Sequence, residues 1–166
     1  MSDNEHNFDL HPIFSLSHDD VVDAIERLTI GYKDYFPAAT TNKLGCLLAQ
    51  KATNKRNGQG YVKCKVRGSQ YEFYAHHLAI IAAQRSVELF DIFFEAPANA
   101  GQLSHLCHST RCIRADHLII EPASVNLDRN KCRGHAWVTC PCGCSHTFNP
   151  CVHTPKCILP RSSSQH

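Results

Sequence analysis

Near the N-terminus, the spacing of apolar residues predicts one amphipathic helix that begins after Ser17. Asp20 follows three residues later, which is the arrangement of a capping box. Four apolar residues recur at helical spacing and form one stripe: Val21, Val22, Ile25 and Leu28. We interpret residues 1–40 as a helical cover for the rest of the chain.

Further along, strand-like runs and turn residues predict a small antiparallel sheet within residues 44–74. Residues 61–67 and 71–74 are two such runs, separated by a Gly-Ser-Gln turn. A third strand over residues 46–51 would complete the sheet.

The run at residues 61–67 has two different faces, because successive side chains of a strand point in opposite directions. One face carries three cations: Lys63, Lys65 and Arg67. The other face carries Val62, Cys64 and Val66. The cationic face suits a DNA groove, although lysines also protect the edge strand of a sheet from aggregation.

Charge is distributed unevenly along the chain, whose net charge is only +2. The first 35 residues hold eight acidic and two basic residues, whereas residues 36–71 hold seven basic residues and no acid. A basic segment suits a polyanion, because each neutralised phosphate releases counterions. A solvated surface explains the charge equally well. The residues that we expect to contact DNA are Lys51, Lys55, Arg56, Lys63, Lys65 and Arg67.

An apolar run at residues 75–84 predicts a buried helix, and the aromatic-rich stretch after it ends near Pro97. We therefore assign residues 75–97 to a helical core. We interpret His76 and His77 as packing or surface histidines. Three phenylalanines are expected in the core, with an interface as the alternative: Phe90, Phe93 and Phe94.

Cysteine and histidine are unusually frequent, with ten cysteines and twelve histidines in 166 residues. The first residues contain no basic region, apolar stretch or cleavage site of a secretory signal, so we expect an intracellular, reducing compartment. There, cysteines clustered with histidines indicate zinc ligands rather than disulfides. No apolar run reaches membrane-spanning length, so we expect no membrane partner.

The segment after the helical core holds the first candidate zinc site. Cys107, Cys112 and His117 have four residues between neighbours, and tetrahedral zinc needs a fourth ligand from elsewhere. We expect Cys64 to supply it from the inward face of the basic strand, with Cys46 as the competing candidate.

A second group of soft ligands lies near the C-terminus. Cys151, His153 and Cys157 supply three donors, and Cys132 could complete the set. Four more donors leave open an additional zinc or a replacement for Cys132: Cys140, Cys142, Cys144 and His146. Zinc would supply folding free energy that this loop-rich segment lacks, in a structural role.

His105 and Asn126 are not needed for zinc and could perform catalysis. An imidazole can take a proton from a water that attacks phosphorus. An amide oxygen can bind Mg²⁺, which neutralises charge on the phosphate. Residues 117–120 are strand-like and Pro122 opens a helix, so a hairpin followed by a helix could place both residues around one phosphate.

The string SHLCHSTRCIRADHL, followed by Asn126 and by CVHTPKC, resembles the His-Cys box family of homing endonucleases, within the ββα-metal or HNH-like nucleases. The close resemblance covers residues 104–132 and 151–157. It implies a small zinc-stabilised α+β nuclease with an antiparallel DNA-binding sheet and long loops. We expect one such domain over residues 41–166, with its His-Cys box at 104–157.

The resemblance also implies roles for individual residues. His105 would be the general base and Asn126 the Mg²⁺ ligand of a site-specific double-strand DNA endonuclease, with Arg67 near the scissile phosphate. The first of two structural zinc ions would be bound by Cys64, Cys107, Cys112 and His117. The second would be bound by Cys132, Cys151, His153 and Cys157.

Members of this family act as homodimers on long, near-palindromic sites and leave short overhangs. They are encoded in introns of nuclear ribosomal genes, so a nuclear location is implied. The chain departs from the family in two ways. An insertion carrying Cys140, Cys142 and Cys144 enlarges the second zinc loop, and only nine residues follow Cys157, which is short for a dimerisation arm.

Two other classes of protein compete with the nuclease. A zinc-stabilised, sequence-specific DNA-binding protein would need neither a free histidine beside a zinc ligand nor a hard-metal ligand. A zinc-organised protein-interaction domain would have no use for an acid-free basic sheet. Mg²⁺-dependent DNA cleavage separates the first class from the nuclease, and salt-sensitive DNA binding argues against the second.

Overall fold

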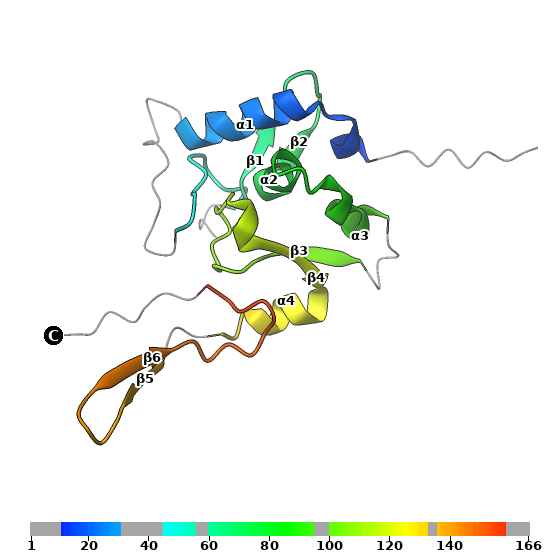
Figure 1. Ribbon diagram of the computed structural model, residues 1–166. Helices are drawn as coiled ribbons and strands as arrows, with labels where there is room; N and C mark the ends of the chain where they lie inside the picture. Colours follow the sequence, from blue (N-terminus) through cyan, green and yellow to red (C-terminus); the bar gives the residue numbers. More distant parts are fainter. Residues whose placement is uncertain (1–10, 31–44, 56–59, 95–99, 133–135, 159–166) are drawn as a thin grey trace, which may run out of the picture.

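The computed structural model describes residues 11–30, 45–55, 60–94, 100–132 and 136–158 (Figure 1). Within these ranges, four α-helices alternate with three two-stranded antiparallel sheets, which confirms the predicted α+β class. The helices are α1 (His18–Ile30), α2 (Ala75–Ala82), α3 (Phe90–Phe93) and α4 (Ala123–Arg129). The strands are β1 (Lys63–Lys65), β2 (Glu72–Tyr74), β3 (Gly101–His105), β4 (Leu118–Pro122), β5 (Ala136–Thr139) and β6 (Ser145–Phe148).

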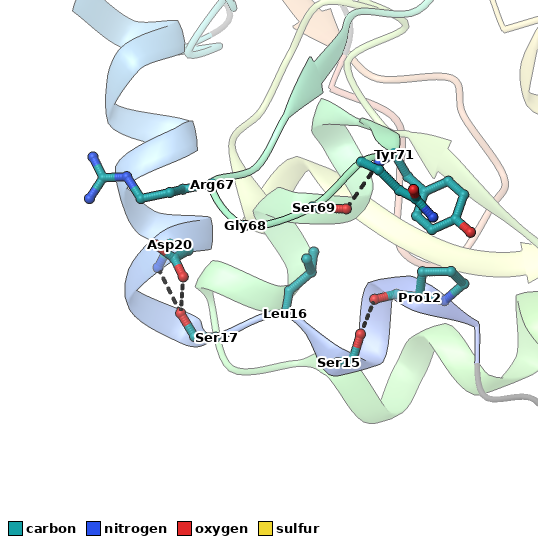
Figure 2. Close-up of a pocket in the computed structure, with 10 residues that line it drawn as sticks. Pro12, Ser15, Leu16, Ser17, Asp20, Arg67, Gly68, Ser69 and Tyr71 are labelled. Carbon is teal, nitrogen blue, oxygen red and sulfur yellow. Dashed lines mark hydrogen bonds between the residues drawn. The ribbon is translucent and has the colours of Figure 1, made fainter.

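Helix α1 begins as its sequence predicts. The Ser17 hydroxyl accepts from the backbone N–H of Asp20 at 3.2 Å and donates to the Asp20 carboxylate at 2.7 Å (Figure 2). This side-chain cap satisfies a backbone donor that the first turn of a helix leaves without a partner. Val21, Ala24 and Leu28 are buried on the side of α1 that packs against α2 (Figure 1).

The basic sheet is shorter than the pattern suggested, but its faces are as predicted. Strand β1 pairs with β2, with Cys64 opposite Phe73. Both of these side chains are buried, whereas Lys65 is exposed. The sheet therefore presents cations on one face and packs its other face into the hydrophobic core.

The third strand, predicted over residues 46–51, does not pair with the basic sheet as expected. Residues 47–49 do not join β1 and β2 but run antiparallel to residues 111–113. The N–H of Ala49 donates to the carbonyl of Arg111 at 2.8 Å, and the N–H of Ile113 donates to the carbonyl of Leu47 at 2.9 Å. Leu48 forms an isolated bridge with Cys112. The backbone groups of this segment are thus satisfied by the loop that follows β3.

The aromatic stretch after α2 is only partly in the core. Leu89 is fully buried, but Phe90 and Phe94 are 41% and 42% exposed, so their prediction as core residues is wrong. Helix α3 is a single turn at the surface, and both exposed rings lie against Phe14, with ring centroids 4.9 and 5.5 Å apart. Phe93 is partly buried against the core.

Strands β3 and β4 and helix α4 form a compact ββα motif. The two strands pair from Gly101 opposite Pro122 to His105 opposite Leu118. Pro122 ends β4 and caps α4, which packs on both strands. The hairpin and helix predicted around residues 117–130 are therefore present.

The β5–β6 hairpin was not predicted from the sequence. It pairs Ala136 with Phe148 and Thr139 with Ser145, and it extends away from the helical part of the molecule (Figure 1). Across the described part of the chain, no helix has the length and apolar character needed to cross a bilayer.

Candidate metal centres and the adjoining motif

The first group of candidate metal-binding side chains combines three residues of the segment that joins β3 to β4 with one residue of the segment at 45–55. It consists of four buried residues: Cys46, Cys107, Cys112 and His117. One donor atom from each lies within 4.8 Å of all the others. The Sγ atom of Cys112 is 3.6 Å from Nδ1 of His117. Ordinary zinc bond lengths at a tetrahedral angle place a sulfur and a nitrogen about 3.6 Å apart, so the group fits zinc.

The structure corrects the expected fourth member of this group, because Cys46 occupies that place and Cys64 does not. The pairing of residues 47–49 with residues 111–113 brings Cys46 to Cys107 and Cys112. Cys64 instead lies on β1 in the hydrophobic core with Val62 and Phe73. Its burial raises the pKa of the Cys64 thiol, as expected for an inert packing residue.

The electrostatics of the first group favour a cation. A hydrogen bond with Cys107 lowers the pKa of Cys112 to about 5, and the same bond raises the pKa of Cys107. Cys112 is therefore the more acidic of the two, and the Cys107 thiol donates a hydrogen bond to its sulfur. A divalent metal would replace these protons, because zinc binds cysteine as the thiolate.

The second group brings together the four residues predicted for the second zinc: Cys132, Cys151, His153 and Cys157. The sulfur atoms of Cys132 and Cys151 are 3.7 Å apart. Nδ1 of His153 lies 3.4 Å from the first sulfur and 3.2 Å from the second. These separations are close to those of a tetrahedral zinc site, for which two sulfurs lie about 3.8 Å apart. Three of the four alternative donors, Cys140, Cys142 and Cys144, form a separate group on the β5–β6 hairpin, and His146 is not a member of either zinc group.

Helix α4 supports the second group through Asp128 and Arg129, which the sequence reasoning did not identify. The carboxylate of Asp128 lies 3.1 Å from Nε2 of His153, so it can orient the ring as the outer carboxylate of a zinc-bound histidine does. The guanidinium of Arg129 donates to the carbonyl of Pro155 at 2.7 Å and approaches the sulfur of Cys157 at 3.5 Å.

Arg129 also forms a buried ion pair inside the ββα motif. Its Nε lies 2.7 and 2.9 Å from the two carboxylate oxygens of Glu121 on β4. The side chains of Arg129 and Glu121 are only 1% and 7% exposed. The spacing of eight residues across a strand–helix junction is not a pattern that points to an ion pair, which explains why both residues were missed.

His105 lies at the end of β3, two residues before Cys107. Its Nε2 is 3.2 Å from the backbone carbonyl of Cys112. The rings of Tyr61 and His76 pack around it, with centroids 6.0 and 5.0 Å away. Burial lowers the pKa of His105 to about 4, so the ring is neutral at neutral pH. The residue remains 8% exposed.

Asn126 is partly buried on α4 within the same motif. Its Nδ2 donates to Oε1 of Gln102 on β3 at 2.9 Å. This bond uses the amide nitrogen and not the oxygen, which is the atom that a cation binds. Strand β3 carries both His105 and Gln102, so it links the position of Asn126 to that of His105.

Arg67 lies in the turn after β1, beside α1 (Figure 2). Its guanidinium pairs with Asp23 at 3.8 Å, and its side chain is 75% exposed. It lines a surface pocket of about 510 Å³ with Pro12, Leu16 and Tyr71. None of the contacts described for His105 involves Arg67.

The lysines of the basic sheet have varied surroundings. Lys51 lies 3.8 Å from the carboxylate of Glu72, and Lys63 lies over the ring of Tyr74 at 4.6 Å. Lys55 and Lys65 are exposed, and Arg56 lies outside the described residues. Residues 36–71 contain no acidic residue. Acidic side chains from the neighbouring segments, Glu72 and Asp23, offset part of their positive charge. Tyr61 and Tyr74, whose rings lie 5.8 Å apart, connect the sheet to the surroundings of His105.

Comparison with known proteins agrees with this arrangement. A family model described as the zinc-binding loop region of homing endonuclease matches residues 45–166, which include both cysteine–histidine groups and the ββα motif. The chain belongs to this homing endonuclease family. No curated protein and no solved structure matches it. The family supports a nuclease-type function and DNA binding, and the two groups support zinc.

Proposed function

We propose that the chain is a Mg²⁺-dependent endonuclease that hydrolyses phosphodiester bonds in double-stranded DNA. One observation carries the proposal. A histidine bonded to a backbone carbonyl and an asparagine whose amide nitrogen is bonded to β3 lie on one ββα motif, and a cysteine–histidine group lies at each end of that motif. A protein that only bound DNA would need neither side chain in that arrangement.

His105 acts as the general base. Its pKa of about 4 keeps the ring neutral, and a neutral ring can accept a proton from water. When Nε2 donates its hydrogen to the carbonyl of Cys112, the lone pair of the ring is on Nδ1. The Cys112 carbonyl therefore selects the tautomer, and the sulfur of the same residue belongs to the first zinc group.

Asn126 supplies an amide oxygen as the protein ligand of the catalytic cation. Mg²⁺ prefers oxygen donors and keeps several of its waters, so one amide on an exposed helix fits this ion. When bound, Mg²⁺ neutralises developing charge on the phosphate and the leaving oxygen. The bond from Asn126 to Gln102 fixes the orientation of the amide relative to β3.

The basic sheet positions the DNA. Lys63 and Lys65 share a face of the strand that leads from Tyr61, and the Tyr61 ring lies against His105. A phosphate backbone on this face would pass toward the catalytic histidine. Lys51, Lys55, Arg56 and Arg67 add positive charge, and Arg67 reaches a phosphate when DNA displaces it from Asp23.

The site-specific homing activity, the homodimer and the nuclear, intron-encoded origin complete the proposal. The support for these properties is the family to which the chain belongs. Sedimentation with and without a palindromic DNA site measures the number of chains in the complex, and two chains on one site are expected.

The test compares four full-length proteins on plasmids carrying ribosomal DNA inserts, with and without Mg²⁺: wild type, His105→Ala, Asn126→Ala and His108→Asn. His108 is a neighbouring histidine with a φ of +57°, a conformation that asparagine tolerates, so its variant is the matched control. Loss of a general base lowers the rate by about 10²–10⁴-fold. We expect that loss for His105→Ala, a comparable loss for Asn126→Ala and none for His108→Asn.

Zinc content and DNA affinity are measured on the same preparations, so that a folding defect is not mistaken for a catalytic one. If zinc-loaded wild type binds DNA but does not cut any insert with any divalent cation, the proposal fails. The chain is then a zinc-stabilised DNA-binding protein.

A further inference from the structure

The tip of the β5–β6 hairpin holds three cysteines that belong to neither group described above. Cys140, Cys142 and Cys144 place their sulfur atoms within 4.8 Å of one another. Cys140 is partly buried and the other two are exposed. They alternate with Pro141 and Gly143, so one short turn supplies all three donors.

The backbone of the turn holds the thiols together. The N–H of Cys140 donates to the carbonyl of Cys144 at 2.9 Å, and the N–H of Gly143 donates to the carbonyl of Cys140 at 2.9 Å. Gly143 has a φ of +86°, in the left-handed region that favours glycine. The paired strands on either side fix the ends of the turn, with Thr139 opposite Ser145. The convergence is therefore a property of the folded hairpin.

If the three thiols ionise, a nearby positive charge is needed to offset the repulsion among the thiolates. Between Arg133 and Lys156 the sequence contains no lysine or arginine. Three thiolates this close would repel one another strongly without a positive charge among them. A thiophilic cation supplies that charge, because soft sulfur ligands select zinc and similar metals.

Disulfide formation cannot use all three residues. The three sulfur atoms lie within 4.8 Å of one another. One sulfur forms only one disulfide, so oxidation always leaves a third thiol beside the pair. A metal ion can engage the three sulfurs at once.

We propose that Cys140, Cys142 and Cys144 form a third metal site, which takes Zn²⁺ through three thiolates and leaves the fourth position to solvent. Binding converts three thiols and one Zn²⁺ into a complex of net charge −1 and releases three protons to water. Unlike the two groups with four protein ligands, this site is exposed and its zinc exchanges. The proposal is independent of DNA cleavage.

The test counts zinc in the full chain after saturation with Zn²⁺ under a thiol reductant and removal of free metal. The variants are Cys142→Ser and the matched control Ser145→Ala, which changes a neighbouring hydroxyl of the same hairpin. We expect Cys142→Ser to hold one zinc fewer than wild type, and Ser145→Ala to equal wild type. With EDTA, one equivalent should leave wild type before the rest, and Cys142→Ser should lack that early phase.

Substitution with Co²⁺ supplies a second measurement that does not depend on the count. The difference between the spectra of wild type and Cys142→Ser should contain the near-ultraviolet charge-transfer band of cobalt–thiolate bonds. Circular dichroism shows whether Cys142→Ser folds as wild type does. Equal zinc content in both proteins overturns the proposal. A disulfide within the hairpin of the reduced, zinc-saturated protein also overturns it.

Discussion

The two halves of the molecule are stabilised in different ways. Residues 11–94 contribute most of the main hydrophobic cluster, which also includes Leu103, Ile113 and Leu118 of the second half. The buried clusters outside that core consist of cysteines, all from residues 101–158 except Cys46, and a buried ion pair joins β4 to α4. The first half folds on apolar burial, whereas the second depends on metal and charge. Chelators should therefore destabilise mainly the second half, and core substitutions mainly the first.

The largest expected effect comes from Cys46→Ala compared with Cys64→Ala. Structural zinc in zinc-finger peptides contributes about 10–16 kcal/mol of apparent free energy. Cys46→Ala should lose one zinc and leave residues 101–158 open to protease. Cys64→Ala should keep every zinc, because this thiol lies in the hydrophobic core. Metal analysis and limited proteolysis measure the difference, and zinc loss in Cys64→Ala would contradict the position assigned to Cys46.

The next effect comes from the ion pair of Arg129 and Glu121. Removing one partner of a buried ion pair typically destabilises a protein by about 3–5 kcal/mol, because the other charge stays buried. Arg129→Met should show a loss of this size in chemical denaturation. The double variant Arg129→Met with Glu121→Leu should recover most of it. If single and double variants are equally unstable, the contacts of Arg129 with Pro155 and Cys157 matter more than the pair.

A core substitution in the first half sharpens the comparison. Leu78 on α2 is fully buried. Leu78→Ala should lower the free energy of unfolding by about 2–5 kcal/mol, because it leaves a cavity. Zinc content and the rate of zinc loss to EDTA should equal those of wild type at a temperature where the variant is folded. A lower zinc content in that variant would show that the two halves do not fold as separately as proposed.

The smallest effect is expected for Asp128→Ala. Loss of an outer-shell partner of a metal-bound histidine typically lowers metal affinity by about 10–100-fold. The second zinc site should weaken by this factor, and the first should not change. Lys131→Ala is the control, since Lys131 pairs with Asp128 at 3.2 Å but does not contact His153. A competition titration with a chromophoric chelator measures both affinities.

Local features of the fold could be predicted from the sequence, whereas non-local ones could not. The capping box at Ser17 and the two faces of β1 depend on neighbouring residues, and the structure contains both. The choice between Cys46 and Cys64 depends on backbone pairing between residues 47–49 and residues 111–113. Such pairing leaves no spacing signal, because the partners are distant in sequence.

The candidate site shows the same division. The cysteines and histidines after residue 100 are close in sequence, so spacing identified most members of the two groups. The roles of Asp128 and Arg129 depend on how α4 faces the second group, which only the fold reveals. Arg67 was expected near the phosphate because the family resemblance implies a sheet arginine there, and its partner Asp23 lies on helix α1.

The pairing of Cys46 with donors beyond residue 106 also sets an order of assembly on the ribosome. Cys46 emerges early but meets its partners only after His117 has been synthesised. The second group waits for Cys157, 40 positions later by the difference of 157 and 117. Asn126 is made between these two points. A nascent chain could thus complete its first metal-binding group before Asp128 and Arg129 of α4 meet their partners in the second group.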